Sequence, residues 1–459
     1  MKILRVLSTF LFLWGSYSVS ASYEYPIQNP FAATIIGTPE PLRPTQESLS
    51  RWQPDYVKMP AVNSQFERKI EKDYQISIFP ERVIPEVFWY EKGGLKYSIA
   101  QHKVQAPLIF VIAGTGASYR SVHVKNLQKT FYQAGFHVVA ISSPTVPNFL
   151  LNASTSSIPG NLLEDSQDIY QVMQRIIKKH GDIKVSDYYL TGYSFGASHA
   201  AFVARVDDAN ASGEQFQFKK VLLINPPLSL VNSVNILDEM LEDNIPGGLN
   251  HFNDYYQKII YKVSAFYHES EQLGLGREFF FEMFKQNPPS EEQMKAMIGF
   301  VFRVASSGMV FSSDVYNHEG YIVPKSKVDD LEASSSLTEY SKVAHRLGFN
   351  DYIEHFYLPN FVKKSGLSRQ TLIEQSSLES IADYLQNNSA ISVMHNLDDP
   401  ILVPGEIDKL KALFPQRTIL YPHGGHLGNI NYSQNVNDIL EYFLGKDVAA
   451  DTAAIGEVR

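Results

Sequence analysis

The stretch of sequence that best indicates the fold is YYLTGYSFGASHAAFVARV, at residues 188–206. A run typical of a strand leads into the pattern Gly-x-Ser-x-Gly at 192–196, and an alanine-rich run typical of a helix follows. Such a pattern fits a sharp turn from strand to helix, in which side chains at either glycine would clash. The turn presents the serine hydroxyl at the end of the strand. Ser194 is therefore predicted to be a nucleophile, and the alternative is a plain tight turn with a buried serine.

Strand and helix patterns alternate on both sides of this turn. Strands are predicted at residues 108–113, 136–141, 188–191, 221–224, 391–394 and 418–421. The first of them, LIFVIA, is a continuous apolar run, as expected for a strand buried on both faces. Two further strands are predicted at 74–79 and 87–99, the second interrupted by Gly93-Gly94. The helical patterns between them include 126–134, 162–179, 197–206, 405–414 and 435–444. This alternation predicts the α/β class, with a mostly parallel sheet and helices on both faces.

The alternation divides the chain into segments. The core is expected at 76–229 and 386–446, separated by a mainly helical insertion at 230–385 that is far longer than an ordinary loop. Because ligands bind at the carboxyl ends of the strands, from which such an insertion leaves, it is predicted to form a cap over the site. Its phenylalanine-rich runs at 279–284 and 300–302 could line an acyl pocket or pack against each other.

The two ends of the chain are predicted to lie outside this core. Residues 1–21 combine a basic start, a short apolar run and small residues before a cleavage site after Ala21, which is typical of a secretory signal peptide. Residues 22–75 lack periodicity and are expected to form an extended arm, and 447–459 a flexible tail. A periplasmic or secreted protein is expected, with no stable membrane span once the signal is removed.

Composition excludes several kinds of chemistry. The chain has 459 residues, no cysteine and a formal net charge of −9. Without cysteine there can be no disulfide, thiol nucleophile or thiolate metal site. The basic residues are scattered, so nucleic acid is not an expected partner. No cofactor is expected.

A general base for Ser194 is predicted just after the last strand, in the sequence Gly-Gly-His-Leu-Gly at 424–428. His426 has glycine neighbours that let its imidazole reach over the edge of the sheet, whereas His423 is a rival at the strand end. Two nearby histidines could also suggest a metal site, but no carboxylate is adjacent in sequence, so no metal is expected.

The acid that orients the histidine is expected after the preceding strand, in Asn-Leu-Asp-Asp-Pro at 396–400. A carboxylate there would fix the imidazole tautomer. Asp398 and Asp399 are both candidates: the Asp-Pro step and the apolar residues after it favour Asp399, and counting from the strand end favours Asp398. The other aspartate could cap the following helix.

Stabilisation of a developing oxyanion requires two backbone N–H groups. One is predicted from Phe195, directly after the nucleophile, and the other from Thr115 in the Gly-rich loop at 113–117. This loop is not a dinucleotide-binding fingerprint, since the third glycine is missing.

Three motifs together resemble the α/β-hydrolase fold, and within it the YheT-like branch of esterases and lipases: GYSFGAS at 192–198, NLDDPI at 396–401 and GGHLG at 424–428. The chain differs from that branch at Ala113, where members often have histidine, and in its signal and arm. The resemblance implies a triad of Ser194, Asp398 or Asp399, and His426 that acts on acyl or lipid-like esters without a cofactor. Amide or thioester hydrolysis, or non-catalytic binding on the same scaffold, are the alternative functions.

Overall fold

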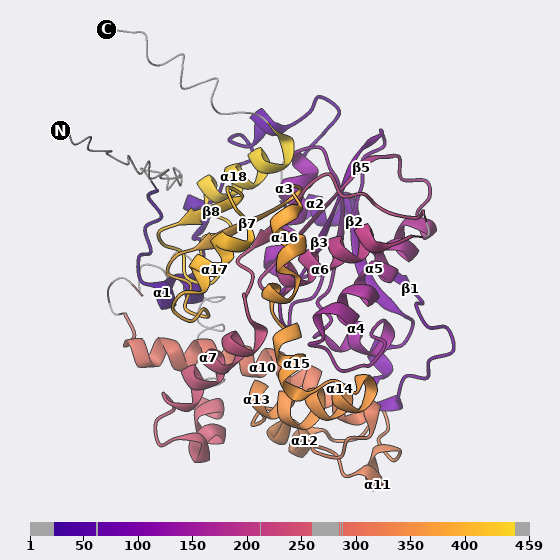
Figure 1. The fold of residues 1–459 in the computed structure, drawn as a ribbon, viewed down its shortest axis with the longest axis vertical. Helices are drawn as coiled ribbons and strands as arrows, with labels where there is room; N and C mark the ends of the chain where they lie inside the picture. Colours follow the sequence, from indigo (N-terminus) through magenta and orange to yellow (C-terminus); the bar gives the residue numbers. More distant parts are fainter. Residues whose placement is uncertain are drawn as a thin grey trace, which may run out of the picture.

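The computed structural model describes residues 23–60, 63–211, 213–258, 284, 286 and 288–445. The predicted signal peptide at 1–21 and tail at 447–459 therefore lie outside the described residues. Eight strands form one sheet in the order β1-β2-β4-β3-β5-β6-β7-β8 (Figure 1). Their bounds are β1 Glu71–Ile76, β2 Leu95–Ala100, β3 Ala106–Ile112, β4 His137–Ile141, β5 Val185–Tyr193, β6 Val221–Ile224, β7 Ile391–Asn396 and β8 Thr418–Tyr421.

The sheet is mostly parallel, as predicted. Strand β2 pairs antiparallel with both β1 and β4, and every pair from β4 to β8 is parallel. Strands β4 and β5 lie on either side of β3. Because strands β3 to β8 are parallel, their carboxyl ends lie at the same edge of the sheet. This strand order with an antiparallel second strand is that of the α/β-hydrolase fold, and the predicted fold class is confirmed.

Different helices cover the two faces of the sheet because successive side chains of a buried strand point to opposite sides. Leu108, Phe110 and Ile112 of β3 join one core cluster, whereas Ile109 and Val111 join the other. The first face is covered by α5 (Leu162–Lys179), α6 (Phe195–Ala209), α16 (Ala382–Asn387) and α17 (Glu406–Leu413). The second face is covered by α3 (Val122–Gln133) and α18 (Ser433–Leu444).

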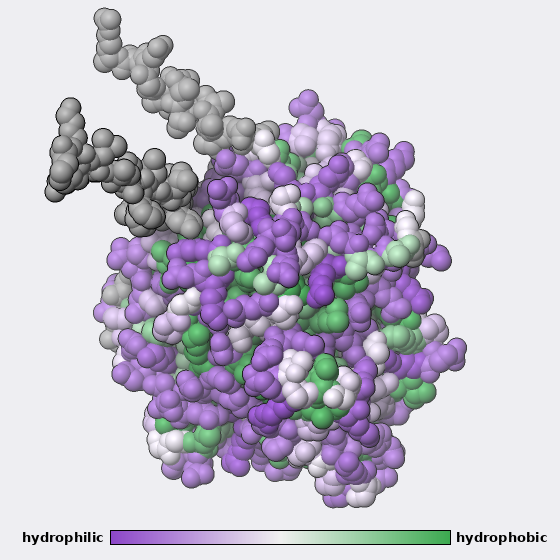
Figure 2. Space-filling view, in the orientation of Figure 1, coloured by the Kyte–Doolittle hydropathy of each residue, from purple (hydrophilic) through white to green (hydrophobic). Residues whose placement is uncertain are grey.

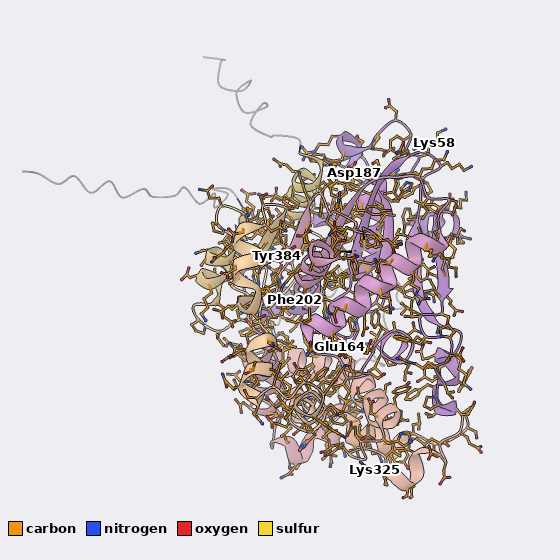
Figure 3. All side chains as sticks on the ribbon, turned by 45° about the vertical axis from the view of Figure 1, so that its right-hand side comes forward. Lys58, Glu164, Asp187, Phe202, Lys325 and Tyr384 are labelled. Atoms are coloured by element: carbon orange, nitrogen blue, oxygen red, sulfur yellow. The ribbon has the colours of Figure 1, made fainter. Side chains whose placement is uncertain are left out.

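The insertion between β6 and β7 forms a helical cap, seen below the sheet in Figure 1. Its described helices are α7 (Leu230–Glu242), α10 (Glu291–Asn317), α11 (Lys325–Val328), α12 (Thr338–Ala344), α13 (Phe349–Tyr352), α14 (Leu358–Ser365) and α15 (Arg369–Gln375). The short core helix α4 (Pro147–Asn152) meets this cap and packs on α10. In Figure 3, Glu164 lies where α5 meets the cap, and Lys325 lies at the far end of the cap. Glu164 forms an ion pair with Lys364 of α14, so this pair joins core and cap.

A buried ion pair holds the cap helices together. Arg303 of α10 is 1% exposed and donates to Asp238 at 2.8 Å and to Glu242 at 2.9 Å, both on α7. Asp238 also accepts the backbone N–H groups of Phe349 and Asn350, which begin α13. One arginine therefore connects three cap helices.

Helix α10 is also, among the described residues, the one helix long and apolar enough to cross a membrane, a stretch the sequence analysis did not single out. Its most apolar window is 61% buried inside the protein. Its buried arginine is ion-paired within the cap, and the helix packs on α7. In this structure α10 is thus the central helix of the cap. The face of the molecule in Figure 2 is mainly hydrophilic, with apolar residues scattered over it.

The N-terminal part of the chain differs from the expected extended arm. Residues 22–75 include two helices, α1 (Pro30–Ile36) and α2 (Asn63–Lys69), and all of strand β1 except its last residue. The sheet therefore begins at Glu71 rather than at residue 76. The strand expected at 74–79 lies at 71–76, and the one expected at 87–99 is a short helical turn at 86–91 followed by β2. Gly93 and Gly94 separate the two with φ of 102° and 109°, which a strand cannot accommodate.

Candidate active site

Ser194 lies in a strained turn between β5 and α6. Its φ of 53° and ψ of −131° are unusual for a residue with a side chain. A Cβ atom on Gly192 would lie 2.1 Å from the carbonyl oxygen of Gly196, and one on Gly196 would lie 2.4 Å from that of Ala113. The Ser194 N–H donates to the Ile224 carbonyl at the end of β6 at 2.8 Å. The turn predicted from the two glycines is therefore formed, and it holds the serine at the carboxyl edge of the sheet.

Three buried side chains from three loops at this edge form a continuous hydrogen-bonded chain. His426 Nε2 lies 2.9 Å from Ser194 Oγ, and His426 Nδ1 lies 2.9 Å from Asp399 Oδ2. With the carboxylate ionised, Nδ1 carries the proton and Nε2 is free to accept the serine hydroxyl proton. The structure thus brings together the predicted nucleophile, base and one of the two predicted acids.

Asp399 is held as an anion by the groups around it. Burial acts to raise the pKa of its carboxyl, but the charge and hydrogen bond of His426, with His395 and the Asn225 amide, lower it below its ordinary value. Asn225 Nδ2 donates to the same oxygen, Oδ2, at 3.0 Å, and the Ile401 N–H donates to Oδ1 at 3.2 Å. An ionised carboxylate in this position fixes the imidazole tautomer that a base requires.

Asp398, the other predicted acid, has a different set of partners. Its carboxylate accepts the backbone N–H groups of Gly424 and Gly425 at 3.2 and 2.9 Å. Burial raises the pKa of this carboxyl, opposed by those two hydrogen bonds. Asp398 therefore supports the glycine turn that leads into His426, and it does not replace Asp399 as the partner of the imidazole.

The structure also bears on His423, the rival candidate for the base, and on the possible metal site. The carbonyl oxygen of His423 accepts from the Asn429 side chain at 3.2 Å, whereas His426 contacts Ser194. Both ring nitrogens of His426 are occupied by Ser194 and Asp399. In the part of the chain that the structure describes, no three His, Asp or Glu side chains converge as metal ligands.

The two residues predicted to supply oxyanion-hole amides flank Ser194. A Cβ atom on Gly114 would lie 3.0 Å from Ser194 Cβ, so the loop after β3 passes directly over the serine. The next residue, Thr115, lines the same cavity as Phe195. The Gly116 N–H is already bonded to Thr145 Oγ1 at 2.8 Å. Thr115 thus remains the loop residue from which we expect the second amide, and this role stays a prediction.

Two polar residues behind the acid were not identified from the sequence. Asn225 directly follows β6, is 3% exposed and has a φ of 46°. A polar residue just after a buried strand at the carboxyl edge is a signal that could have indicated it. His395 is buried under Asp399: its Nε2 lies 3.0 Å from the Pro226 carbonyl and its Nδ1 lies 3.9 Å from Asp399 Oδ2. Burial lowers the pKa of the His395 ring.

The N-terminal segment forms an unexpected support for the histidine loop. Thr34 Oγ1 in α1 accepts the backbone N–H of His426 at 2.9 Å. The Tyr25 and Thr38 hydroxyls donate to the Gly428 carbonyl at 2.9 and 2.7 Å. A Cβ atom on Gly425 would lie 2.2 Å from the Pro30 carbonyl oxygen, so the two segments are in close contact. We call residues 23–38 the brace.

Comparison with solved structures identifies several α/β hydrolases that this chain resembles distantly. Esterase B from Lactobacillus rhamnosis is 12% identical, with a TM-score of 0.36 over 90% of this chain and 94% of that one. A thioesterase domain from the curacin biosynthetic pathway is 11% identical, with a TM-score of 0.35 over 82% and 99%. A membrane phospholipase A is 12% identical, with a TM-score of 0.38 over 82% and 86%. Such distant likeness across three activities assigns none of them.

No protein-family model matches the chain, and no curated protein matches its sequence.

Proposed function

We propose that the protein is a serine hydrolase that cleaves carboxylic esters through an acyl-enzyme intermediate. The observation that supports this proposal is the chain of two 2.9 Å contacts from Ser194 through His426 to Asp399. A strained nucleophile turn, a buried base and an ionised acid occur together at the edge of the sheet where ligands of this fold bind.

In the proposed mechanism His426 Nε2 takes the Ser194 proton as Oγ attacks the ester carbonyl carbon. The negative charge that develops on the carbonyl oxygen is stabilised by the amides of Phe195 and Thr115. His426 then gives the proton to the departing alcohol, which leaves the acyl group on Ser194. A water molecule, activated by the same histidine, hydrolyses this acyl-enzyme. Asp399 stays ionised throughout and stabilises the imidazolium.

Labelling with a fluorophosphonate tests the activated serine. The wild-type protein should be labelled, and the Ser194→Ala and His426→Ala variants should not. Ser198→Ala is a matched control, because Ser198 lies in the same motif but donates to the Pro227 carbonyl at 3.2 Å. Folded wild-type protein that takes no label, or labelling that survives in Ser194→Ala, would contradict the proposal.

Two further aspects are proposed on sequence grounds. Placement in the YheT-like branch rests on the motifs GYSFGAS, NLDDPI and GGHLG. Export to the periplasm or medium rests on the signal-peptide pattern of residues 1–21. Cell fractionation with mass spectrometry of the mature N-terminus tests export: we expect the protein outside the cytoplasm, beginning at Ser22.

A further inference from the structure

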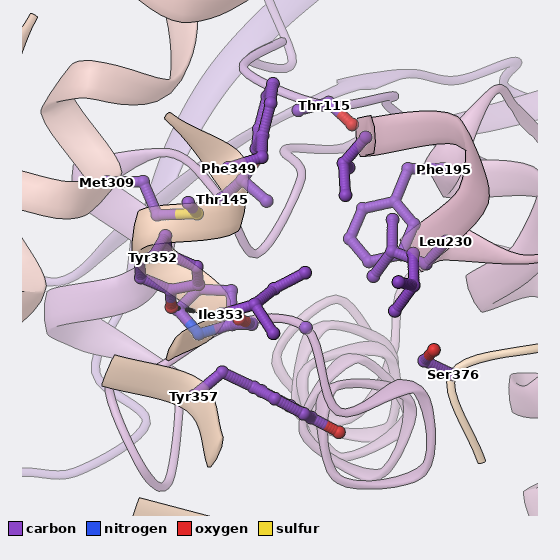
Figure 4. A pocket seen from close by; sticks show the side chains of 14 residues that line it. Thr115, Thr145, Phe195, Leu230, Met309, Phe349, Tyr352, Ile353, Tyr357 and Ser376 are labelled. Atoms are coloured by element: carbon purple, nitrogen blue, oxygen red, sulfur yellow. Dashed lines mark hydrogen bonds between the residues drawn. The ribbon is translucent and has the colours of Figure 1, made fainter. Parts of the chain in front are cut away.

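Two separate cavities adjoin the Ser194–His426 contact, one lined by Phe195 and the other by His426. The inner cavity reaches the oxyanion side, where Thr115 and Phe195 line it together with cap residues (Figure 4). The outer cavity reaches the other partner, His426, and is lined by residues of the brace and of α10. The two cavities share no lining residue. An ester bound across the serine therefore meets two different environments.

The chemistry of the reaction assigns one side of the ester to each cavity. The base that deprotonates the serine must afterwards protonate the leaving oxygen, so the alcohol portion lies beside His426 Nε2. The carbonyl oxygen points to the oxyanion donors, and the acyl chain takes the remaining direction around the carbonyl carbon, away from the alcohol. The inner cavity is thus placed to receive the acyl chain, and the outer cavity to receive the alcohol.

The walls of the inner cavity suit an uncharged hydrocarbon chain. No acidic or basic side chain is among its described lining residues. The Tyr352 hydroxyl at its wall is already bonded to the Pro159 carbonyl at 2.9 Å. The remaining cap contribution is mainly apolar: Leu230, Val234, Met309, Phe349, Ile353 and Tyr357. A charged acyl group would find no partner here and would lose its hydration.

The inner cavity is also small. Its volume is about 50 Å³. The outer cavity, measured in the same way, has a volume of about 600 Å³, so the inner cavity accepts a much smaller group. Met309, Phe349 and Tyr357 are 3%, 6% and 4% exposed, and they close its walls. A long fatty acyl chain would require the cap core to be repacked.

The described phenylalanines of the two cap runs, Phe284, Phe300 and Phe302, are not among the residues that line this cavity. Phe300 packs within the cap against Leu241, Ile245 and Phe252. Phe302 has its ring centroid 6.3 Å from that of His426. Residues 279–283 lie outside the described part of the chain. Of the two alternatives for the 300–302 run, Phe300 follows the self-packed one.

The outer cavity is larger and more polar. Its volume is about 600 Å³, and Thr34, Thr38, Arg43, His123 and Asn431 line it beside His426. The rest of its lining is mainly apolar: Ile35, Ile36, Val122, Phe284, Pro289, Met297 and Leu427. No Asp or Glu is among its described lining residues. The Thr34 and Thr38 hydroxyls are already bonded to the histidine loop. The guanidinium, imidazole and amide of Arg43, His123 and Asn431 suit an alcohol with several hydrogen-bonding groups.

We propose that the natural substrate is an ester of a short, uncharged carboxylic acid with a bulky polar alcohol. This inference rests on the proposed function and narrows its substrate class. Ser194 Oγ forms the bond to the acyl carbon, the bond from that carbon to the alcohol oxygen breaks, and the serine proton travels through His426 to the alcohol. Water later supplies the hydroxyl of the released acid. This inference narrows the acyl or lipid-like esters that the sequence motifs imply to esters of short acids.

A series of p-nitrophenyl esters from acetate to dodecanoate tests the acyl side. We expect kcat/KM to peak at butyrate to hexanoate and to fall roughly tenfold or more at decanoate and dodecanoate, because each excess methylene must be forced into a closed apolar wall. Met309→Ala removes three heavy atoms from that wall. It should move the peak to longer chains by about two carbons.

Met173→Ala is the matched control, because Met173 is fully buried in α5 and packs in the sheet core instead of the cavity. It should lower stability and leave the preferred chain length unchanged. Equal kcat/KM from butyrate to dodecanoate, or a peak that stays in place in Met309→Ala, would overturn the assignment of the inner cavity. Ser194 would still be labelled in that case, so failure of the inference is distinct from failure of the proposed function.

The alcohol side is tested with methyl butyrate and a butyrate monoester of glucose. We expect kcat/KM to be roughly tenfold or more higher for the sugar ester, since only that alcohol fills the outer cavity. Met297→Trp, in the wall of the outer cavity, should remove this preference. Equal rates on both esters in the wild-type protein would refute the assignment.

Discussion

Removal of the Thr34 hydroxyl tests whether the brace positions the catalytic histidine. Thr34 lies 392 residues from His426 in sequence, and its Oγ1 accepts the His426 N–H at 2.9 Å while donating to the Pro30 carbonyl at 2.7 Å. Thr34→Val keeps the shape of the side chain and removes the acceptor. An N–H left without a partner in a part-buried place costs about 1–3 kcal/mol. If the loop shifts to recover that energy, the imidazole moves with it.

We expect Thr34→Val to lower kcat roughly 5- to 100-fold, which is the same energy expressed as a rate. The preferred acyl chain length should not change, since Thr34 does not line the inner cavity. Thr34→Ser keeps the hydroxyl and should restore most of the rate. Thr371→Val removes a half-buried threonine hydroxyl from α15, another short helix, and serves as the matched control.

The reasoning fails if Thr34→Val retains kcat within about twofold of wild type while its melting temperature is unchanged, since an unpaired N–H must then cost nothing. A Thr34→Ser variant as slow as Thr34→Val would also refute it, because the effect would then come from the lost methyl group. Steady-state kinetics together with thermal unfolding separates these results.

Three further perturbations have defined outcomes. Asp399→Asn should lower kcat by about 10⁴ through the wrong imidazole tautomer, whereas Asp398→Asn should lower it by no more than about 10-fold; comparable losses would contradict the geometry. Gly196→Ala places a Cβ atom 2.4 Å from the Ala113 oxygen and should lower the melting temperature by on the order of 5 °C, with an unchanged value as the contrary result. Burial raises the pKa of Asp168 to about 7 from 3.8. The folded state then binds the extra proton, so stability should fall as pH rises from 3.8 through 7. Asp168→Asn should flatten that fall, measured by melting temperature at pH 5 and pH 8, and a slope that persists would assign the fall to other groups.

Much of the fold could be predicted because its signals are local. The apolar runs of β3 to β8 and the amphipathic pattern of α5 are each contained in fewer than twenty residues, and their alternation defines the class. The strand expected at 87–99 was wrong because Pro85 and the two glycines at 93 and 94 allow a helical turn to precede β2. The two glycines indicated a turn, but they did not indicate how long the helical turn before them is.

The parts of the site that could be predicted are likewise those with local signals in the sequence. The motifs around Ser194, Asp399 and His426 are local, and the structure brings these three residues into contact. The choice between Asp398 and Asp399 depends on how one loop bends, since the two carboxylates bind groups on different sides of that loop. Asn225, His395 and Thr34 support the site from segments 174, 4 and 392 residues away from their partners. The periodicity of a sequence segment cannot predict such contacts.

The composition of the loop at 424–428 explains why it needs the support of the brace. Three glycines in five residues let the loop carry His426 over the sheet edge, but glycine loses the most conformational freedom on folding. The loop is ordered by bonds from outside it: Asp398 holds two N–H groups, Thr34 holds that of His426, and Tyr25 and Thr38 hold the Gly428 carbonyl. Most of these partners come from the N-terminal segment, which also lines the outer cavity. The brace is therefore expected to support the proposed active site, and a variant that lacks residues 23–38 should lose kcat and its preference for bulky alcohols together.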